Sequence, residues 1–334
     1  MAGGLLHAAR PLTMPNVLIT DYPWPDLKTE RAILAEAGLT LVAGPARVSP
    51  SAEIEALTLE HDPVAIMCCW ARLSAQAIAN APSLRHIARL GVGLDNIDVA
   101  AATQRGVLVT NLPDYCVEEV SDHAVALLMA WARGLIPLDQ EVKLGRWEPA
   151  SVPLYRMRAL TVGIVGYGRI GRRAAEKLSG FGMRVLATGR GPIEDAGPAV
   201  EAVSLDDLLA QSDAVIICAP LTPATHHLFD DRRLGRMRKG AFLVNVTRGG
   251  LIDNDALVRA LRSGQLSGAG LDVVEGEPNP PSDLTTRADV IVTPHVAFSS
   301  ASSVAELRTR VSQEIVRVHR GEAPEQPCNA PVGG

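Results

Sequence analysis

The sequence predicts an α/β protein made of two doubly wound domains, each with a parallel sheet. Short β-branched apolar runs alternate with amphipathic, helix-like segments, which is typical of strands joined by helical crossovers. This alternation occurs twice, on either side of a long helical region, and the second series carries a glycine-rich turn after its first strand. A chain of 334 residues is also too long for one ordinary hydrophobic core.

The first series begins after a short N-terminal stretch. Residues 1–13 lack the pattern of a signal peptide and precede a second methionine, Met14, so we expect a disordered extension or a misplaced start there. Strands are expected at 16–20, 39–43, 64–69, 86–91 and 107–112. Helices are expected between them, at 29–38, 51–60, 74–81 and 99–106.

A long helical region at 117–147 separates the two series, with expected breaks near Gly134 and Pro137. One apolar face recurs at helical spacing within it: Val120, Ala124, Leu127, Leu128 and Trp131. Strands of the second series are expected at 161–166, 184–188, 214–219, 241–246, 267–274 and 290–294. A last helix at 303–321 has no strand after it, so we expect it to pack back onto the first domain.

Composition argues against several classes of function. The net charge is −5 and no basic tract is present, so a nucleic-acid partner is not expected. No apolar run approaches the ~20 residues that span a bilayer. The five cysteines show no C-x-x-C spacing, which indicates free thiols and a cytoplasmic protein. His226 and His227 are adjacent, a poor ligand geometry, and no cluster has metal spacing, so no metal is expected.

The glycine-rich turn predicts a dinucleotide site. Gly166, Gly168 and Gly171 follow an apolar strand and open an amphipathic helix. This order suits a tight turn, a close approach of the backbone to a pyrophosphate, and close helix–strand packing. Tyr167 and the pair Arg169–Ile170 complete the turn, and the helix N-terminus attracts the anion. A purely structural glycine turn is the alternative.

The end of the next strand predicts which nucleotide binds. An NAD site usually has an acidic residue about 20 residues after the turn, which binds the ribose 2′-hydroxyl. Here the strand ends in Thr188 and is followed by Gly189 and Arg190. Glycine leaves room for a 2′-phosphate, and a guanidinium can bind it with paired hydrogen bonds. We therefore expect a preference for NADP(H), with NAD(H) possible; an ordinary exposed arginine is the alternative.

Three polar residues follow strands of the second series. They are Arg248, Glu277 and His295. Hydride transfer to a 2-keto acid needs a cation for the substrate carboxylate, a proton donor that works near neutral pH, and an acid that orients this donor. Taken singly, each residue has another interpretation: a surface ion pair, a turn or a structural histidine.

From about Val17 to Pro327, the sequence resembles the D-isomer-specific 2-hydroxyacid dehydrogenase family. The resemblance rests on "ARLGVGLDNIDVAAATQRGVLVTN", "VEEVSDHAVALLMAWAR", "VGIVGYGRIG", "MRKGAFLVNVTRGGLID", "GAGLDVVEGEP" and "TPHVAF". It implies that Arg248, Glu277 and His295 are catalytic. It further implies that Asp272 contacts the nicotinamide carboxamide, that Thr247 lies in the cofactor site, and that Leu90, Gly91, Val92 and Gly93 offer N–H groups to the substrate carboxylate.

The resemblance also implies a domain arrangement. A flavodoxin-like substrate domain would comprise 14–112 and 298–334, a Rossmann NAD(P)-binding domain would comprise 113–297, and the active site would lie in the cleft. Members of the family are usually homodimers paired through the coenzyme domain and the helix near 117–133. The apolar face of that helix could serve this pairing, or it could pack within the chain.

Two departures from the usual family pattern bear on the substrate. Gly189-Arg190 resembles the NADPH-dependent glyoxylate and hydroxypyruvate reductases, whereas "HVAFSS" resembles the branch of the C-terminal-binding-protein corepressors. Phe298 would then border the substrate pocket or pack between domains. We expect an NAD(P)H-dependent reductase of a small 2-keto acid; the alternative is a nucleotide-sensing interaction protein with little turnover. Formate dehydrogenases of this fold are disfavoured, because they carry Gln where Glu277 stands.

Overall fold

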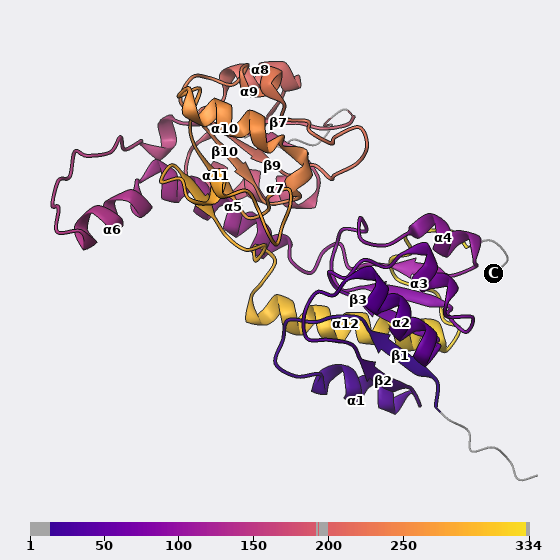
Figure 1. Ribbon diagram of the computed structural model, residues 1–334. Coiled ribbons are helices and arrows are strands. Elements are labelled where there is room, and N and C mark those ends of the chain that lie inside the picture. Colours follow the sequence, from indigo (N-terminus) through magenta and orange to yellow (C-terminus); the bar gives the residue numbers. More distant parts are fainter. Residues whose placement is uncertain (1–13, 192, 194–199, 332–334) are drawn as a thin grey trace, which may run out of the picture. The chain divides into compact units, whose positions relative to one another are not determined.

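The chain folds into two compact units, as a computed structural model that describes residues 14–191, 193 and 200–331 shows (Figure 1). Unit 1 comprises Met1–Tyr115 and Val304–Gly334, and unit 2 comprises Cys116–Ser303. The expected domain limits, after 112 and after 297, lie a few residues before these boundaries. The expected extension at 1–13 lies outside the described residues.

Unit 1 contains a five-stranded parallel sheet of order β2-β1-β3-β4-β5. The strands are β1 (Asn16–Ile19), β2 (Thr40–Ala43), β3 (Ala65–Cys68), β4 (His86–Arg89) and β5 (Leu108–Thr110), and each lies within an expected strand. Helices α1 (Lys28–Glu36), α2 (Ser51–His61), α3 (Ala75–Ala79) and α4 (Val99–Gln104) connect them. This strand order is the flavodoxin-like one.

Helix α12 (Ala301–His319) brings the C-terminal segment back to unit 1, as expected. Its Leu307, Val311 and Ile315 are buried. Arg308 on this helix binds both carboxylate oxygens of the fully buried Glu30 of α1, at 2.7 and 2.8 Å. Both ends of the chain therefore build unit 1.

Unit 2 contains a seven-stranded parallel sheet of order β12-β11-β10-β9-β6-β7-β8. Its strands are β6 (Thr161–Val165), β7 (Arg184–Thr188), β8 (Val200–Ala202), β9 (Ala214–Ile217), β10 (Ala241–Asn245), β11 (Leu266–Leu271) and β12 (Val290–Val292). Six were expected, and β8 was missed because it is a short, largely exposed edge strand. The order contains that of the Rossmann fold, with the reversal between β6 and β9.

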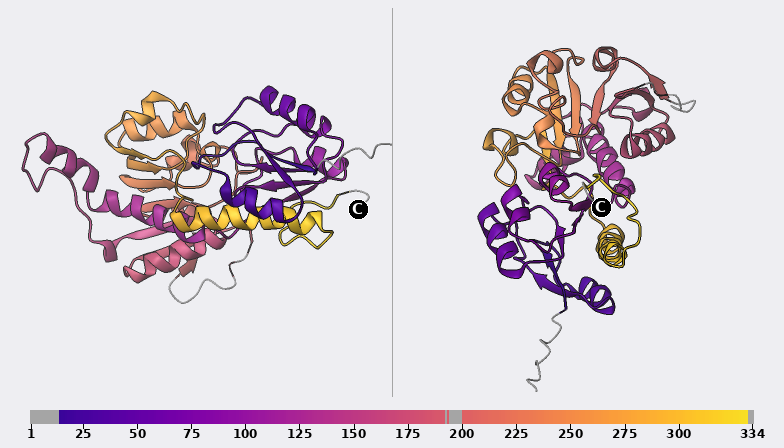
Figure 2. Two further views of the ribbon diagram at one scale, coloured as in Figure 1. Left: turned by 90° about the horizontal axis from the view of Figure 1, so that it is seen from below. Right: turned by 90° about the vertical axis from the view of Figure 1, so that its right-hand side faces the viewer.

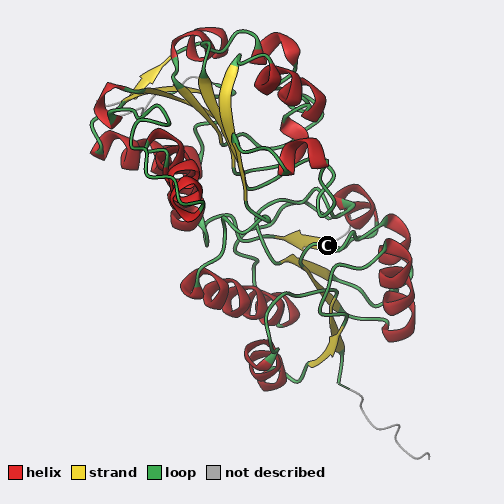
Figure 3. Cartoon of the chain, turned by 60° about the vertical axis from the view of Figure 1, so that its left-hand side comes forward, coloured by secondary structure: helices red, strands yellow, loops and turns green. Residues whose placement is uncertain are grey.

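Helices cover both faces of each sheet (Figure 3). In unit 2 they are α5 (Val117–Ala132), α6 (Leu135–Lys143), α7 (Arg169–Gly180), α8 (Leu205–Gln211), α9 (Asp231–Leu234), α10 (Asn254–Arg262) and α11 (Ser282–Thr285), with 3₁₀ turns η1 (Met157–Ala159) and η2 (Gly249–Leu251). Among the residues described, no helix combines the length and the apolar character needed to cross a membrane.

The long helical region breaks at Gly134, as expected, where φ is +60°. The expected break at Pro137 is wrong, because Pro137 lies in the first turn of α6, where a helix needs no N–H donor.

The apolar face of α5 packs within the chain: the Trp131 ring stacks on Phe242 at 4.9 Å, and Leu127 lies against Gly270. Of the two interpretations given for this face, pairing with a second chain or packing within the chain, the structure therefore agrees with packing within the chain. Helix α6 and the loop after it project from the rest of unit 2 (Figure 2).

Candidate active site

The glycine turn joins β6 to α7 at the point where the strand order of unit 2 reverses. Gly166 has a φ of +101°, and a Cβ there would collide with the backbone of Cys218 and Ala219. A Cβ at Gly171 would collide with the carbonyl oxygen of Gly166. At Gly168 no heavy atom of the described residues lies within 4 Å of the same position, so these residues leave the backbone before α7 open to a ligand. These features fit a pyrophosphate at the helix N-terminus.

The end of β7 lies directly beside this turn. The N–H of Gly166 donates to the carbonyl oxygen of Thr188 at 2.9 Å, which holds the last residue of β7 against the glycine turn. Gly189 and Arg190 follow at once, and both are exposed. The structure therefore brings the sequence-predicted 2′-phosphate residues next to the predicted pyrophosphate site.

The three predicted catalytic residues follow three neighbouring strands of one parallel sheet. Arg248 comes after β10, Glu277 after β11 and His295 after β12, and these strands pair in the order β10-β11-β12. Because the carboxyl ends of parallel strands share one edge, all three belong to the edge at which open α/β sheets bind ligands.

Glu277 and His295 contact each other directly. Oε1 of Glu277 lies 2.8 Å from Nδ1 of His295, and both side chains are partly exposed, at 39% and 27%. Phe298 meets the His295 ring edge-on, with 6.5 Å between ring centroids. The carboxylate fixes one nitrogen of the imidazole, so the other, Nε2, is the atom left to exchange a proton with a substrate.

Asp272 holds the backbone that carries His295. Its side chain is almost fully buried and accepts the N–H groups of Val296 and Ala297, each at 2.9 Å. Thr293 donates its hydroxyl to the same carboxylate at 2.6 Å, and Nε2 of His123 on α5 lies 2.9 Å from that hydroxyl. His295 itself has a φ of +54°, a backbone conformation that needs such support.

Sequence reasoning missed His123, Thr293 and Asn245. Asn245 is fully buried at the end of β10, and its side chain donates to the carbonyl oxygen of Arg248 at 2.9 Å while accepting the N–H of Thr247 at 3.1 Å. A polar residue at the end of an otherwise apolar strand was the available signal for Asn245. No comparable signal links His123 to the active-site loop, because 170 residues separate it from Thr293.

In unit 1, the loop Leu90–Gly93 follows β4. Two of its N–H groups are already engaged, since Leu90 donates to the carbonyl of Cys68 and Gly91 to that of Arg89. Those of Val92 and Gly93 donate to no other described residue. The buried Arg89 side chain, which sequence reasoning also missed, braces the loop by donating to the carbonyls of Leu90 and Gly93.

Comparison with known proteins identifies the family. The family model described as "D-isomer specific 2-hydroxyacid dehydrogenase, NAD binding domain" matches residues 125–297, which include the glycine turn and all three predicted catalytic residues. The chain belongs to the D-isomer-specific 2-hydroxyacid dehydrogenase family. This D-2-hydroxyacid dehydrogenase is accordingly an NAD(P)-dependent oxidoreductase that acts on the CH–OH group of 2-hydroxy acids.

Individual relatives agree with this assignment. A glyoxylate reductase of Korarchaeum cryptofilum is 41% identical over 267 residues, 78% of this chain and 80% of the relative. The solved D-lactate dehydrogenase of Aquifex aeolicus, complexed with NAD and lactic acid, is 29% identical with a TM-score of 0.85 and covers 95% of this chain and 100% of its own. An NADPH-dependent glyoxylate/hydroxypyruvate reductase of Sinorhizobium meliloti, solved with NADP and malonate, is 31% identical, has a TM-score of 0.82 and covers 94% and 96% of the two chains.

Proposed function

We propose that this dehydrogenase reduces a small 2-keto acid, such as glyoxylate or hydroxypyruvate, and prefers NADPH as the hydride donor. The observation that carries the proposal is the Glu277–His295 pair, at 2.8 Å, on the sheet edge that also bears Arg248. When bound at the glycine turn, NADPH would supply the hydride that the keto carbon receives. Nε2 of His295 gives its proton to the keto oxygen, Glu277 holds Nδ1, and Arg248 binds the substrate carboxylate.

The preference for NADPH is supported by Gly189 and Arg190. Among the residues that the structure describes directly after β7, 189–191 and 193, none carries a carboxylate that would repel a 2′-phosphate, and the exposed Arg190 guanidinium could bind it. Glyoxylate and hydroxypyruvate are supported by the relatives that act on them, one of which is named as NADPH-dependent.

Initial rates with NADPH and NADH on glyoxylate, hydroxypyruvate, pyruvate and bulkier 2-keto acids test both parts. Arg190→Ala should lower kcat/KM for NADPH roughly 10–100-fold, the equivalent of one charge-assisted hydrogen bond or two, and leave the NADH reaction unchanged. Arg184→Ala is the matched control, because Arg184 is an exposed arginine at the other end of the same strand, paired with Glu201.

Each outcome separates the alternatives. Equal loss with both cofactors, or no loss, would show that Arg190 does not bind the 2′-phosphate. Tight NADPH binding without turnover on any 2-keto acid would instead favour a nucleotide-sensing interaction protein.

We also propose that the enzyme is a homodimer that pairs through α6 and the loop after it. This segment exposes large apolar side chains that a monomer rarely leaves in water: Leu135, Ile136, Val142, Leu144, Trp147 and Leu154, which are 40–83% exposed. Trp147→Asp should convert the dimer to monomer in analytical ultracentrifugation. Phe181→Asp is the control, since Phe181 is an aromatic residue that is also exposed, at 42%, and follows α7.

A cytoplasmic location is proposed from the cysteines. All five are free thiols, and burial raises the pKa of Cys68 to about 12, which keeps that thiol protonated and inert. Recovery of the native protein in a cytoplasmic cell fraction is the expected result, and recovery from a secreted fraction would contradict it.

A further inference from the structure

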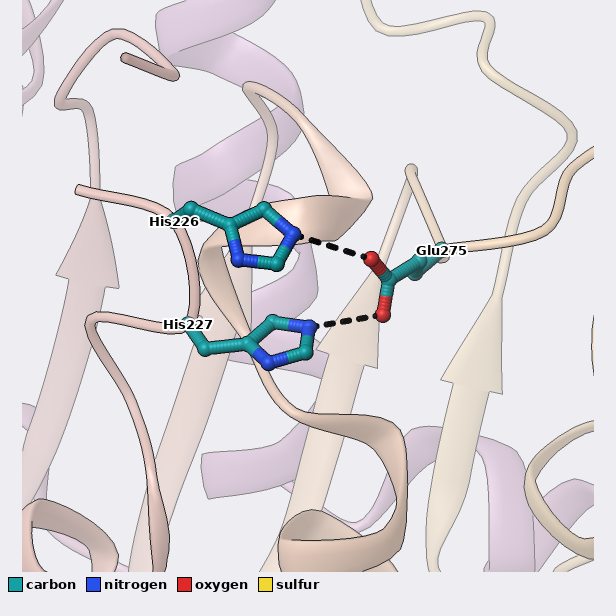
Figure 4. Close-up of side chains that lie close together, drawn as sticks. All are labelled: His226, His227 and Glu275. Carbon is teal, nitrogen blue, oxygen red and sulfur yellow. Dashed lines mark hydrogen bonds and ion pairs between the residues drawn. The ribbon is translucent and has the colours of Figure 1, made fainter. Parts of the chain in front are cut away.

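Two histidines and a glutamate from separate loops of unit 2 meet at one point. His226 and His227 follow β9, and Glu275 follows β11 (Figure 4). Nε2 of His226 lies 3.4 Å from Oε1 of Glu275, and Nε2 of His227 lies 2.9 Å from Oε2. The nitrogen and oxygen atoms that could serve as ligands all lie within 4.8 Å of one another.

These separations are those of a metal-binding cluster. In a tetrahedral zinc site with bonds of roughly 2.0–2.2 Å, neighbouring ligand atoms lie about 3.3 Å apart. The two nitrogen–oxygen distances bracket this value. The rings stack at 3.9 Å between centroids and direct both Nε2 atoms to the same carboxylate, so small side-chain rotations would bring the three groups around one ion.

The short segment η2 fixes the backbone of two of the three ligands, His227 and Glu275. The N–H of His227 donates to the carbonyl of Gly250 at 2.8 Å. Gly249 lies so close to the backbone of Glu275 that a Cβ there would collide with it, and Asn254 donates to the Glu275 carbonyl at 3.0 Å. The backbones of His227 and Glu275 are therefore held in place before any ion arrives, which reduces the entropy cost of binding.

We propose that His226, His227 and Glu275 bind a divalent transition-metal ion of the zinc class, with water in the fourth position. Two imidazoles and one carboxylate suit Zn²⁺, Co²⁺ or Ni²⁺, whereas Mg²⁺ and Ca²⁺ prefer oxygen ligands throughout. The side chains are 52%, 36% and 38% exposed, so the ion enters directly from solvent. This site is separate from the predicted catalytic set and does not rest on the proposed function.

From the sequence alone no metal is expected at His226 and His227, because adjacent residues rarely bind one ion with good geometry. Two features of the fold change this. His227 has a φ of +48°, which turns its ring to the same side as that of His226, and η2 brings Glu275 from 48 residues away to face both rings.

Titration of the full chain with Co²⁺, followed by displacement with Zn²⁺, tests the proposal. We expect one Co²⁺ per chain, with visible absorption bands typical of four-coordinate cobalt and without the charge-transfer band of a cysteine thiolate. Zn²⁺ should also raise the Tm, because an ion bound only by the folded state stabilises it by mass action.

Single-ligand variants decide whether this cluster is the site. His226→Asn and Glu275→Gln should each weaken Co²⁺ binding at least 10-fold, whereas His319→Asn and His61→Asn, on unit 1, should bind as the wild type does. Binding unchanged in both ligand variants, a thiolate band, or no Zn²⁺ uptake in competition with a chromophoric chelator would overturn the proposal. None of these readouts depends on turnover.

Discussion

At the residue scale, three carboxylates of one segment, Asp272, Glu275 and Glu277, contact different partners. After β11, Asp272 accepts backbone N–H groups of the His295 segment, Glu275 faces His226 and His227, and Glu277 faces the imidazole of His295. Three carboxylates within six residues thus contact different histidines or the backbone around them. Of these three carboxylates, Glu277 is the one that contacts the ring of His295, the proposed proton donor.

Glu277→Gln tests that role. The amide keeps the shape of the side chain but removes the charge that faces the imidazole, so kcat for 2-keto acid reduction should fall roughly 10²-fold with the NADPH affinity unchanged. Glu275→Gln in chelator-treated buffer is the matched control and should lose much less. Steady-state kinetics measure both variants; turnover within twofold of wild type in Glu277→Gln would remove Glu277 from the catalytic set.

His86 predicts a pH dependence of stability. It is 2% exposed in β4, with Nε2 at 2.8 Å from the Thr110 hydroxyl, and burial lowers its pKa to about 3. The unfolded chain protonates this side chain below about pH 6.5, whereas the folded chain does not. Between those values the unfolded state binds one more proton, so folding stability falls as the pH falls.

Urea unfolding at pH 7 and pH 5 measures the effect. The wild type should lose about 2 kcal/mol more than His86→Phe over this interval, because Phe has nothing to protonate. His61→Phe, at a half-exposed position, should keep the wild-type loss. Parallel curves for wild type and His86→Phe would show that His86 is not buried in its neutral form.

At the scale of elements, the sequence predicted what alternation and local geometry determine. Eleven strands and the Gly134 break follow from apolar periodicity and turn chemistry, which act over a few residues. Strand β8 has one half-buried and two exposed residues, so it leaves no apolar signal. The predicted helix break at Pro137 is wrong because proline disrupts the interior of a helix and not its first turn.

The site was predictable to the extent that its residues follow strands. Glycine spacing and strand ends located the cofactor turn and the Glu277–His295 pair. The links that support them, His123 to Thr293 and Asn245 to Arg248, depend on side-chain packing between elements. Such contacts carry no local pattern, so they require the structure.

Helix α5 should therefore influence the active-site loop through Thr293. Thr293→Val keeps the shape of the side chain but removes the hydroxyl between His123 and Asp272, which leaves the buried carboxylate short of a donor. A lost buried hydrogen bond costs roughly 1–3 kcal/mol. We expect kcat for reduction to fall roughly tenfold and the alkaline limb of the pH profile of kcat/KM, where the proposed donor His295 loses its proton, to move, with Thr293→Ser restoring both.

A double-mutant cycle separates this link from general damage. If His123 acts through Thr293, adding His123→Leu to Thr293→Val should cause little further loss, because the connection is already broken. Fully additive losses, or a Thr293→Ser variant as impaired as Thr293→Val, would show that His123 and the His295 loop are independent.

At the scale of the whole molecule, the return of the C-terminal segment makes unit 1 depend on residues nearly 300 positions apart. Pro327 bridges to Thr110, and Asn329 accepts the N–H of Val109 at 2.8 Å. A further tie is the ion pair of Arg308 with Glu30, in which Glu30 is fully buried and Arg308 is only 14% exposed. Removal of one partner leaves a charge without compensation inside the unit.

Arg308→Met should therefore destabilise unit 1 by roughly 3–5 kcal/mol, because it strands the Glu30 carboxylate in the interior. The double variant Glu30→Leu with Arg308→Met should recover most of the loss, since a well-packed apolar pair can replace a buried ion pair. Trp24 reports the transition, because the Arg308 guanidinium lies 5.3 Å from the centre of its ring. Urea unfolding followed by tryptophan fluorescence measures each variant; equal midpoints for Arg308→Met and the double variant would show that the loss comes from packing and not from the stranded charge.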